Sequence, residues 1–283
     1  MSRMTKLSFP GLGIGEFSVD SVAFSIGEFD IAWYAIIITL GMIAAITYSI
    51  LQAKKIGISL DEMLDFVIFA IPIGIVGARL YYVLSKIDHY SSLGDVLNIR
   101  NVGLAIYGGL IAGTATVLVM CKIKKIKFMA LADCVMPGVI LAQAIGRWGN
   151  FMNGEAFGEE TEIFCRMGIQ NFLTDFNFIY VHPTFLYESL WNLVGFLLIF
   201  FLIRKLKQYD GQIFIITCGW YGLGRMLVEG LRTDSLYTNI GSLSFRTSQV
   251  LAGAILVVCI ASLIYFAYKK PSGEFYTKSK SEK

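Results

Sequence analysis

The sequence predicts an all-α, polytopic membrane protein with about seven transmembrane helices, its N-terminus outside the cytoplasm and its C-terminus inside. Three observations support this fold class. Hydrophobic residues make up 55% of the 283 residues and charged residues only 16%, a balance that soluble domains rarely reach. The apolar residues form unbroken runs of helical length, whereas strands of a membrane barrel alternate over about ten residues. Basic residues follow every second run, which is typical of cytoplasmic loops.

The apolar runs define the predicted helices, because a bilayer core of about 30 Å requires roughly 20 apolar residues per helix. The runs lie at approximately 29–52, 62–84, 104–121, 129–148, 184–204, 211–231 and 248–268. A polar insert at about 155–181 separates the fourth run from the fifth. We expect the whole chain, 1–283, to form a single integral-membrane domain.

The placement of lysine and arginine sets the predicted orientation. Four segments, AKKIG, CKIKKIK, IRKLK and YKKPSGEFYTKSKSEK, follow the first, third, fifth and seventh runs and hold 14 of the 24 basic residues. The insert carries five acids against one arginine. Positive residues favour the cytoplasmic side, so the four basic segments are expected inside and the insert outside. The five cysteines have no CxxC spacing, which indicates small apolar residues and neither a disulfide framework nor a metal site.

Several ionisable residues remain inside the apolar runs, where a charge costs at least ~2.5–3.5 kcal/mol and requires a partner or a wet cavity. Arg79 is explained well by snorkelling toward the outer interface, and Arg225 less well. In the sixth run, Tyr221, Arg225, Glu229 and Arg232 fall on one narrow face of a helix. Arg225 and Glu229 could simply neutralise each other, but the whole stripe is more typical of a polar cavity wall.

The stretch GRWGNFMNGE, residues 146–155, lies at the outer end of the fourth run. Arg147 and Asn150 share one side of a turn, and Gly154 allows a bend or a close approach of a ligand. Asn150 and Asn153 are ordinary caps for a helix end. Capping does not require Arg147 and Glu155 as well, whereas a phosphate site uses planar donors together with a carboxylate that holds them.

Other residues near the outer helix ends admit two interpretations. Tyr107 precedes paired glycines and is either an interfacial aromatic or a hydroxyl that reaches the cavity. Trp33 and Tyr34 are by default part of the aromatic belt. His182 and Glu188, at the start of the fifth run, are most often structural. Gly109 and Gly113 form a GxxxG pair, which favours helix packing.

The polar groups within the membrane all lie toward its outer half. A channel would place polar residues through the whole thickness of the bilayer. An anion transporter would favour broken helices and inverted repeats, and neither is apparent in the sequence. A seven-helix receptor is a weaker alternative, since nothing marks a signalling loop.

The stretch GRWGNFMNGEAFG resembles the signature of the bacterial phosphatidylglycerol–prolipoprotein diacylglyceryl transferases. The resemblance covers nearly the whole chain, because other motifs follow in the order expected for that family. These motifs are WY at 33–34, GARLYYV around Arg79, GGLIAG at 108–113, HPTFLYE at 182–188 and YGLGRMLVEGLR at 221–232.

The resemblance implies transfer of the sn-1,2-diacylglyceryl group of phosphatidylglycerol to the lipobox cysteine thiol of a prolipoprotein, with release of glycerol 1-phosphate. It implies a multi-pass protein of the bacterial cytoplasmic membrane whose active site faces outward. The implied partners are phosphatidylglycerol, the signal-peptide and lipobox segment of the precursor, and membrane lipid, with no nucleic acid. Neither a metal nor an organic cofactor is implied.

The resemblance also implies roles for individual residues. Arg147 is expected to bind the lipid phosphate, and Arg225 is the second essential arginine. The catalytic candidates are Arg147, Arg225, Tyr107 and Glu155. The candidates for binding phosphatidylglycerol are Arg147, Asn150, Asn153, Gly154, Tyr34, Arg79, Tyr221, Glu229, Arg232 and His182.

Tyr107 departs from the family pattern, in which many members carry histidine before the paired glycines. Histidine there is a natural general base toward the thiol. A phenol is almost fully protonated at neutral pH, because its ordinary pKa is about 10, so it makes a poor base. We therefore expect arginine electrostatics to supply most of the rate and Tyr107 to orient the thiol or a phosphate oxygen.

Overall fold

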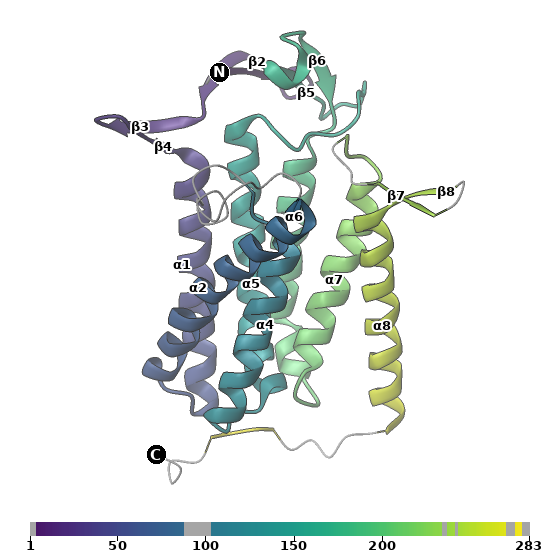
Figure 1. The fold of residues 1–283 in the computed structure, drawn as a ribbon. Helices are drawn as coiled ribbons and strands as arrows, with labels where there is room; N and C mark the ends of the chain where they lie inside the picture. Colours follow the sequence, from purple (N-terminus) through teal and green to yellow (C-terminus); the bar gives the residue numbers. More distant parts are fainter. Residues whose placement is uncertain (1–3, 88–102, 234–236, 241–242, 270–274, 279–283) are drawn as a thin grey trace. The chain divides into compact units, whose positions relative to one another are not determined.

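The computed structural model describes residues 4–87, 103–233, 237–240, 243–269 and 275–278. Within these ranges the chain is mostly helical (Figure 1). The long helices are α1 Trp33–Ala53, α2 Leu60–Ser85, α4 Ile106–Ile123, α5 Phe128–Asn153, α6 Thr184–Phe201, α7 Gln212–Glu229 and α8 Thr247–Lys269. The strands are β1 Met4–Phe9, β2 Ile14–Asp20, β3 Val22–Ile26, β4 Phe29–Ala32, β5 Met167–Gln170, β6 Ile179–Val181, β7 Tyr237–Ile240 and β8 Leu243–Arg246.

Six helices in the described part of the chain are long and apolar enough to cross a membrane, which agrees with a polytopic membrane protein. The helix outside this set is α7, which carries Arg225 and Glu229. The predicted all-α class omits the strands, which contain three to seven residues each. The fourth predicted span is too short, because α5 continues through the GRWGNFMN stretch to Asn153.

The described chain divides into two compact units, Met1–Tyr48 with Val135–Glu274 and Ser49–Cys134 with Phe275–Lys283. In the first unit, residues near the N-terminus and residues of the polar insert form one antiparallel sheet in the order β2-β1-β5-β6. Figure 1 shows this sheet beyond the upper ends of α5 and α6. Leu7, Ile169 and Val181 are buried beneath it together with Phe185 of α6, so the sheet is anchored to the helices by an apolar core.

Close packing joins α1 to α5 within the first unit. A Cβ atom added at Gly41 would lie 3.1 Å from the carbonyl oxygen of Ala142, and one added at Gly149 would lie 2.9 Å from the ring of Tyr34. Glycine therefore allows α1 to approach the segment of α5 that carries the GRWGN motif.

The hairpins β3–β4 and β7–β8 also belong to this unit and lead directly into α1 and α8.

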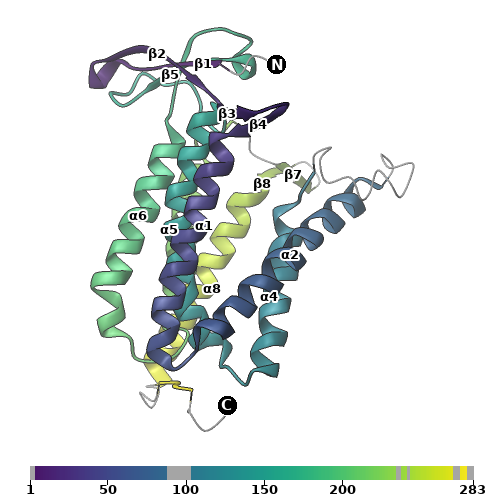
Figure 2. The ribbon, with the colours of Figure 1, turned by 90° about the vertical axis from the view of Figure 1, so that its left-hand side faces the viewer.

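The second unit is built on α2 and α4, which lie side by side (Figure 2). Their contact is lined with small residues: a Cβ atom added at Gly77 would meet Ala112, and one added at Gly109 would lie 3.2 Å from the carbonyl oxygen of Gly74. The packing interpretation of Gly109 is therefore confirmed. At the other end of α2, Ser59 and Glu62 form a capping box.

The C-terminal segment 275–278 is bound to the second unit. The backbone N–H of Lys278 donates to Ile56 at 2.9 Å, and its ammonium group pairs with Glu62. The hydroxyl of Tyr276 donates to the carbonyl of Lys125 at 3.1 Å. This short stretch thus connects the loop before α2 to the loop after α4.

Candidate functional site

The polar cluster of the first unit is centred on Glu188 of α6. Its carboxylate pairs with Arg147 of α5, and it lies 3.4 Å from Nη1 of Arg225 on α7. Arg232, three residues after the end of α7, lies 3.1 Å from the same carboxylate. Three guanidiniums from three segments of the chain therefore share one carboxylate.

A second carboxylate supports the cluster. Glu229 is 1% exposed, and its Oε2 lies 2.5 Å from Nη2 of Arg225. This i,i+4 pair lies on the helical face predicted from the sequence. With Arg147, Arg232 and Glu188 included, three positive charges stand against two negative charges. These five charged side chains meet where little water reaches them, so electrostatic interactions among them are poorly screened.

The end of α5 is fixed by the predicted asparagines. Nη1 of Arg147 donates to Asn150 at 3.4 Å, and the side-chain amides of Asn150 and Asn153 donate to Glu155 at 2.9 and 3.2 Å. Glu155 therefore holds the two amides, and Asn150 links it to Arg147. The asparagine side chains thus bind to other residues of the motif. The backbone turns at Gly154, which has a φ of +61°.

Both the backbone conformation at position 154 and the close neighbours of this position require glycine. Only glycine adopts a positive φ at little cost, and a Cβ atom there would lie 2.6 Å from Oγ1 of Thr5 and 2.7 Å from Nδ2 of Asn171. The carbonyl of Gly154 accepts a hydrogen bond from Asn171 at 2.7 Å. Gly154 is thus buried where α5 meets the sheet, in contact with β1.

Two tryptophans set the register between α6 and α7. The indole of Trp191 donates to the carbonyl of Trp220, and the indole of Trp220 donates to the carbonyl of Trp191, each at 3.0 Å. The rings stack with centroids 4.4 Å apart. Gly195 and Gly224 leave the space that the two rings occupy. This reciprocal contact places Glu188 opposite Arg225.

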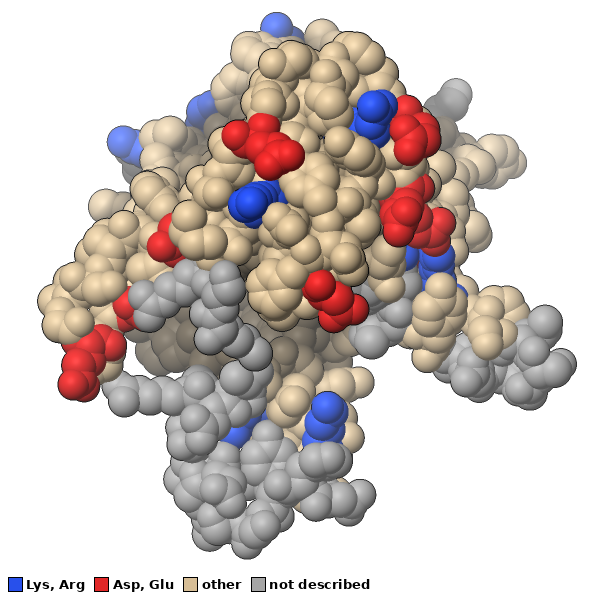
Figure 3. Space-filling view, turned by 90° about the horizontal axis from the view of Figure 1, so that it is seen from above, with Lys and Arg blue, Asp and Glu red and all other residues tan. Residues whose placement is uncertain are grey.

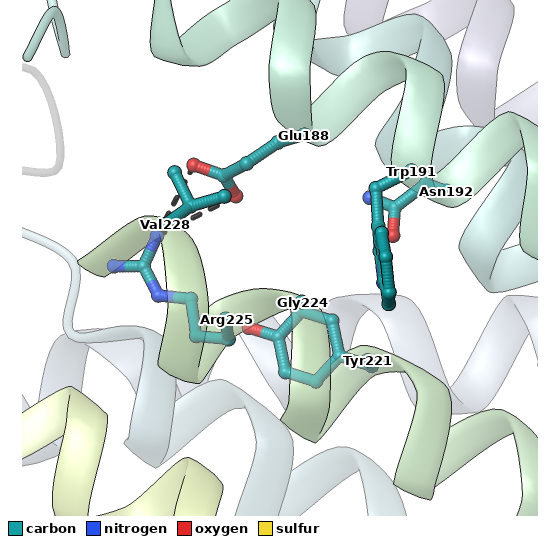
Figure 4. A pocket seen from close by; sticks show the side chains of 7 residues that line it. All are labelled: Glu188, Trp191, Asn192, Tyr221, Gly224, Arg225 and Val228. Atoms are coloured by element: carbon teal, nitrogen blue, oxygen red, sulfur yellow. Dashed lines mark hydrogen bonds and ion pairs between the residues drawn. The ribbon is translucent and has the colours of Figure 1, made fainter. Parts of the chain in front are cut away.

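A cavity of about 10 Å³ lies beside the cluster (Figure 4). Its size corresponds to about one water molecule. Arg225 and Tyr221 face it from α7, and Glu188 faces it from α6. The full lining is Glu188, Trp191, Asn192, Tyr221, Gly224, Arg225 and Val228.

The structure brings most of the predicted site residues into the first unit. The cluster or its cavity includes Arg147, Arg225, Glu229, Arg232 and Tyr221. Asn150, Asn153, Glu155 and Gly154 lie at the end of α5, and Tyr34 packs against Gly149.

The other predicted residues lie elsewhere. Nδ1 of His182 lies 3.2 Å from the hydroxyl of Tyr187, which is 3.5 Å from Sγ of Cys165. Arg79 and Tyr107 belong to the second unit, where the buried Arg79 donates to the carbonyl of Gly103 at 3.1 Å. Arg79 is thus buried and bonded to the backbone just before α4, and its snorkelling toward the outer interface stays a prediction. The sites of Arg79 and Tyr107 stay predictions.

Glu188 lies at the centre of the cluster but was not among the predicted site residues, because a structural role was the favoured interpretation at that position. It is 5% exposed and is the partner of three arginines. The available signal was a carboxylate within an apolar run, on a helix that also carries Ser189 and Asn192. Among the residues that the structure describes, His, Cys, Asp and Glu form no group of three or more suited to a metal ion.

Comparison with known proteins adds an independent finding. A family model described as prolipoprotein diacylglyceryl transferase matches residues 21–265. A phosphatidylglycerol–prolipoprotein diacylglyceryl transferase of Finegoldia magna is 46% identical over 253 residues, covering 89% of this chain and 97% of that protein. The protein of the same name from Listeria welshimeri is 42% identical to this chain, and so is the phosphatidylglycerol–prolipoprotein diacylglyceryl transferase 1 of Clostridium perfringens. They cover 90% and 91% of this chain, and 92% and 99% of their own lengths.

Proposed function

Because the chain belongs to the prolipoprotein diacylglyceryl transferase family, we propose that its arginine–glutamate cluster is the site of the transfer. The chain is a membrane transferase that carries out the diacylglyceryl transfer step of lipoprotein maturation. Its substrates are phosphatidylglycerol and a prolipoprotein. The remaining question is which groups in the cluster act on which part of the lipid.

The reaction requires an anion site. The cysteine thiol of the prolipoprotein releases its proton, which the departing phosphate monoester takes up, and its sulfur attacks the glycerol carbon that bears the phosphate. A carbon–sulfur bond forms, the carbon–oxygen bond to the phosphate breaks, and glycerol 1-phosphate leaves with the electron pair. Negative charge therefore accumulates on the departing phosphate oxygen, where positioned guanidiniums stabilise it.

The observation that carries the proposal is the sharing of Glu188 by Arg147, Arg225 and Arg232. Three converging guanidiniums offer planar donors and positive charge, and a phosphodiester is an anion that matches them. Arg147 is the most exposed of the three arginines, at 21% for its side chain, against 16% and 9% for the others. Arg147 thus receives the phosphate, and Arg225 stabilises the leaving oxygen.

The neighbouring residues shape the headgroup site. Asn150, Asn153 and Glu155 hold the motif at the end of α5, and Gly154 forms its turn. Tyr221, on the cavity wall, orients the lipid beside Arg225. Of the remaining predicted groups, Tyr34 and His182 of the first unit contribute to lipid binding. Arg79 and Tyr107 of the second unit keep the roles toward lipid and thiol that the family resemblance implies.

Orientation in the membrane completes the proposal. The protein is a single integral-membrane domain. Helix α7 also crosses the membrane and brings the number of spans to seven, with the N-terminus of the protein outside and its C-terminus inside. The view from above in Figure 3 displays several acidic side chains on the face that carries the sheet, where the insert has five acids against one arginine. A face poor in lysine and arginine is expected outside and the lysine-rich loops inside. The cluster is thus reached from the outer leaflet, and the acyl chains leave laterally into lipid.

Transfer of labelled diacylglyceryl from phosphatidylglycerol vesicles to a lipobox peptide tests the proposal. We expect transfer by the wild-type protein and loss of at least 100-fold in Arg147→Ala, because the phosphate loses its guanidinium. Arg166→Ala, which removes the arginine directly before β5, is the control and should keep wild-type activity. A folded wild-type protein without transfer would overturn the function, and an active Arg147→Ala would overturn the site.

A further inference from the structure

Arg246, the last residue of β8, joins three segments of the first unit. Its Nε donates to the hydroxyl of Tyr237 on β7 at 3.0 Å. Its Nη1 donates to the backbone carbonyl of Glu229 at 2.6 Å, and its Nη2 donates to the carboxylate of Glu159 at 3.2 Å. One planar guanidinium thus uses three of its donors in three directions.

The bond to Glu229 fixes the end of α7. Glu229 is the last residue of that helix, so its carbonyl is one of those that lack a partner within the helix. The same oxygen also accepts the N–H of Arg232 at 3.3 Å. A cation at a helix C-terminus is also favoured by the helix dipole. Arg246 therefore stabilises the turn that leads from α7 to Arg232.

The bond from Arg246 to Glu159 supports the same turn, because the backbone of Glu159 also contacts it. The backbone N–H of Glu159 donates to the carbonyl of Leu231 at 2.8 Å, and its carbonyl accepts the N–H of His182 at 3.0 Å. Gly158, the preceding residue, forms an isolated bridge with Arg232. The side chain of Glu159 thus binds Arg246, and its backbone binds Leu231. Arg246 and Glu159 therefore both bind the segment Glu229–Arg232, one at its first residue and the other at Leu231.

We propose that Arg246 and Glu159 are positioning residues for the transfer reaction, acting through the α7 turn on Arg225 and Arg232. This inference rests on the proposed function of the cluster. Arg225 lies one helical turn before Glu229, and Arg232 lies three residues after Glu229. Release of the turn displaces two of the three guanidiniums that converge on Glu188, while Arg147 on α5 stays in place.

The kinetic consequence follows from which arginines move. A displacement of about 1 Å in groups that act on the transition state can cost ~10²-fold in rate. Loss of an interaction made only in the transition state lowers kcat with little change in KM. Because Arg147 still receives the phosphate, Arg246→Ala should lower kcat by ~10- to 100-fold and change KM for phosphatidylglycerol by less than about threefold.

Arg166→Ala provides a matched control. Arg166 also pairs with a glutamate, Glu162, at 3.9 Å, and its guanidinium lies 5.2 Å from the ring of Tyr180. Arg246 likewise lies 5.9 Å from the ring of Tyr237. Their side chains are 26% and 18% exposed. The carbonyls bound by Arg166 are those of Glu162 and Ile163, which lie outside α7.

The experiment measures kcat, KM for phosphatidylglycerol and the thermal unfolding midpoint for wild type, Arg246→Ala, Arg246→Lys, Glu159→Gln and Arg166→Ala. We expect partial recovery of kcat in Arg246→Lys, since an ammonium still reaches one acceptor, and an intermediate kcat in Glu159→Gln. We expect no change in Arg166→Ala. Wild-type kcat in Arg246→Ala would overturn the inference, as would a loss that disappears when the assay is run well below the unfolding midpoint.

These outcomes separate this inference from the proposed function. Absence of transfer in the wild type, or full activity in Arg147→Ala, overturns the function or its site. An active wild type, an inactive Arg147→Ala and a normal Arg246→Ala together overturn only the positioning role.

Discussion

Two pairs of neighbouring helices, α6–α7 in the first unit and α2–α4 in the second, are held together by different contacts. Between α6 and α7, Glu188 meets Arg225 and the indole of Trp191 bonds to the backbone of Trp220. Between α2 and α4, the contact is made by glycines and alanines such as Gly77. Small residues allow close approach, whereas directional bonds also fix rotation and register. The directional contacts occur where charged side chains must converge.

The largest effect should come from Glu188→Gln, which breaks the α6–α7 pair at its centre. The three arginines lose the negative charge that they share, and loss of a buried ion-pair partner costs about 3–5 kcal/mol. Activity should fall at least 100-fold and the unfolding midpoint should drop. Glu162→Gln, at a side chain that is 90% exposed, should change neither. Wild-type activity in Glu188→Gln would show that the shared carboxylate is dispensable.

Gly108→Ala tests the α2–α4 pair in the same way. The added Cβ would meet the carbonyl oxygen of Gly77, a backbone atom that moves only if the helix moves. Overpacking of this kind costs about 1–3 kcal/mol, so the unfolding midpoint should fall. The control is Gly15→Ala, since a Cβ at Gly15 meets nothing within 4 Å. Equal midpoints for the two variants would mean that α2 and α4 do not depend on close approach.

Trp191→Phe sharpens the comparison by removing one directional bond. The aromatic ring is kept, but the donor to the carbonyl of Trp220 is lost. One hydrogen bond contributes about 0.5–1.5 kcal/mol, and Trp220→Phe should have the same effect, because the contact is reciprocal. Thermal unfolding gives the stability, and transfer assays should show a modest loss as Glu188 shifts. A strong effect from only one of the two variants would contradict a reciprocal contact.

Tyr107→Phe should have the smallest effect. We expect it to keep activity within about tenfold of the wild type, since arginine electrostatics supply most of the rate. The measurement is kcat for protein of wild-type thermal stability. Complete loss in a normally folded variant would instead place an essential chemical group on the α2–α4 pair.

The helices and four of the five charged residues of the cluster could be predicted from the sequence for physical reasons. A bilayer requires apolar runs of a set length, so the run at 104–121 corresponds closely to α4 at 106–123. The i,i+4 spacing brings Arg225 to Glu229 on any helix. The arginine motif indicated Arg147 because the site chemistry requires planar donors.

The missed features depend on contacts between distant parts of the chain. The partners of Glu188 come from α5, from α7 and from the turn after α7, so its own helix gives no sign of them. The sheet pairs residues 4–9 with residues 167–170, and its strands are too short for an alternating pattern to stand out. Strand pairing over such separations is set by the folded helices beneath it.

The cavity beside Arg225 has a consequence for inhibitor discovery. It holds about one water molecule, whereas a phosphate group is several times larger. A phosphate group that enters this cavity therefore competes with the carboxylate of Glu188 for Arg225. Screens for compounds against this enzyme should accordingly favour strongly anionic groups, such as phosphonates, that outcompete an internal carboxylate. Neutral fragments that merely fill the existing space should bind weakly.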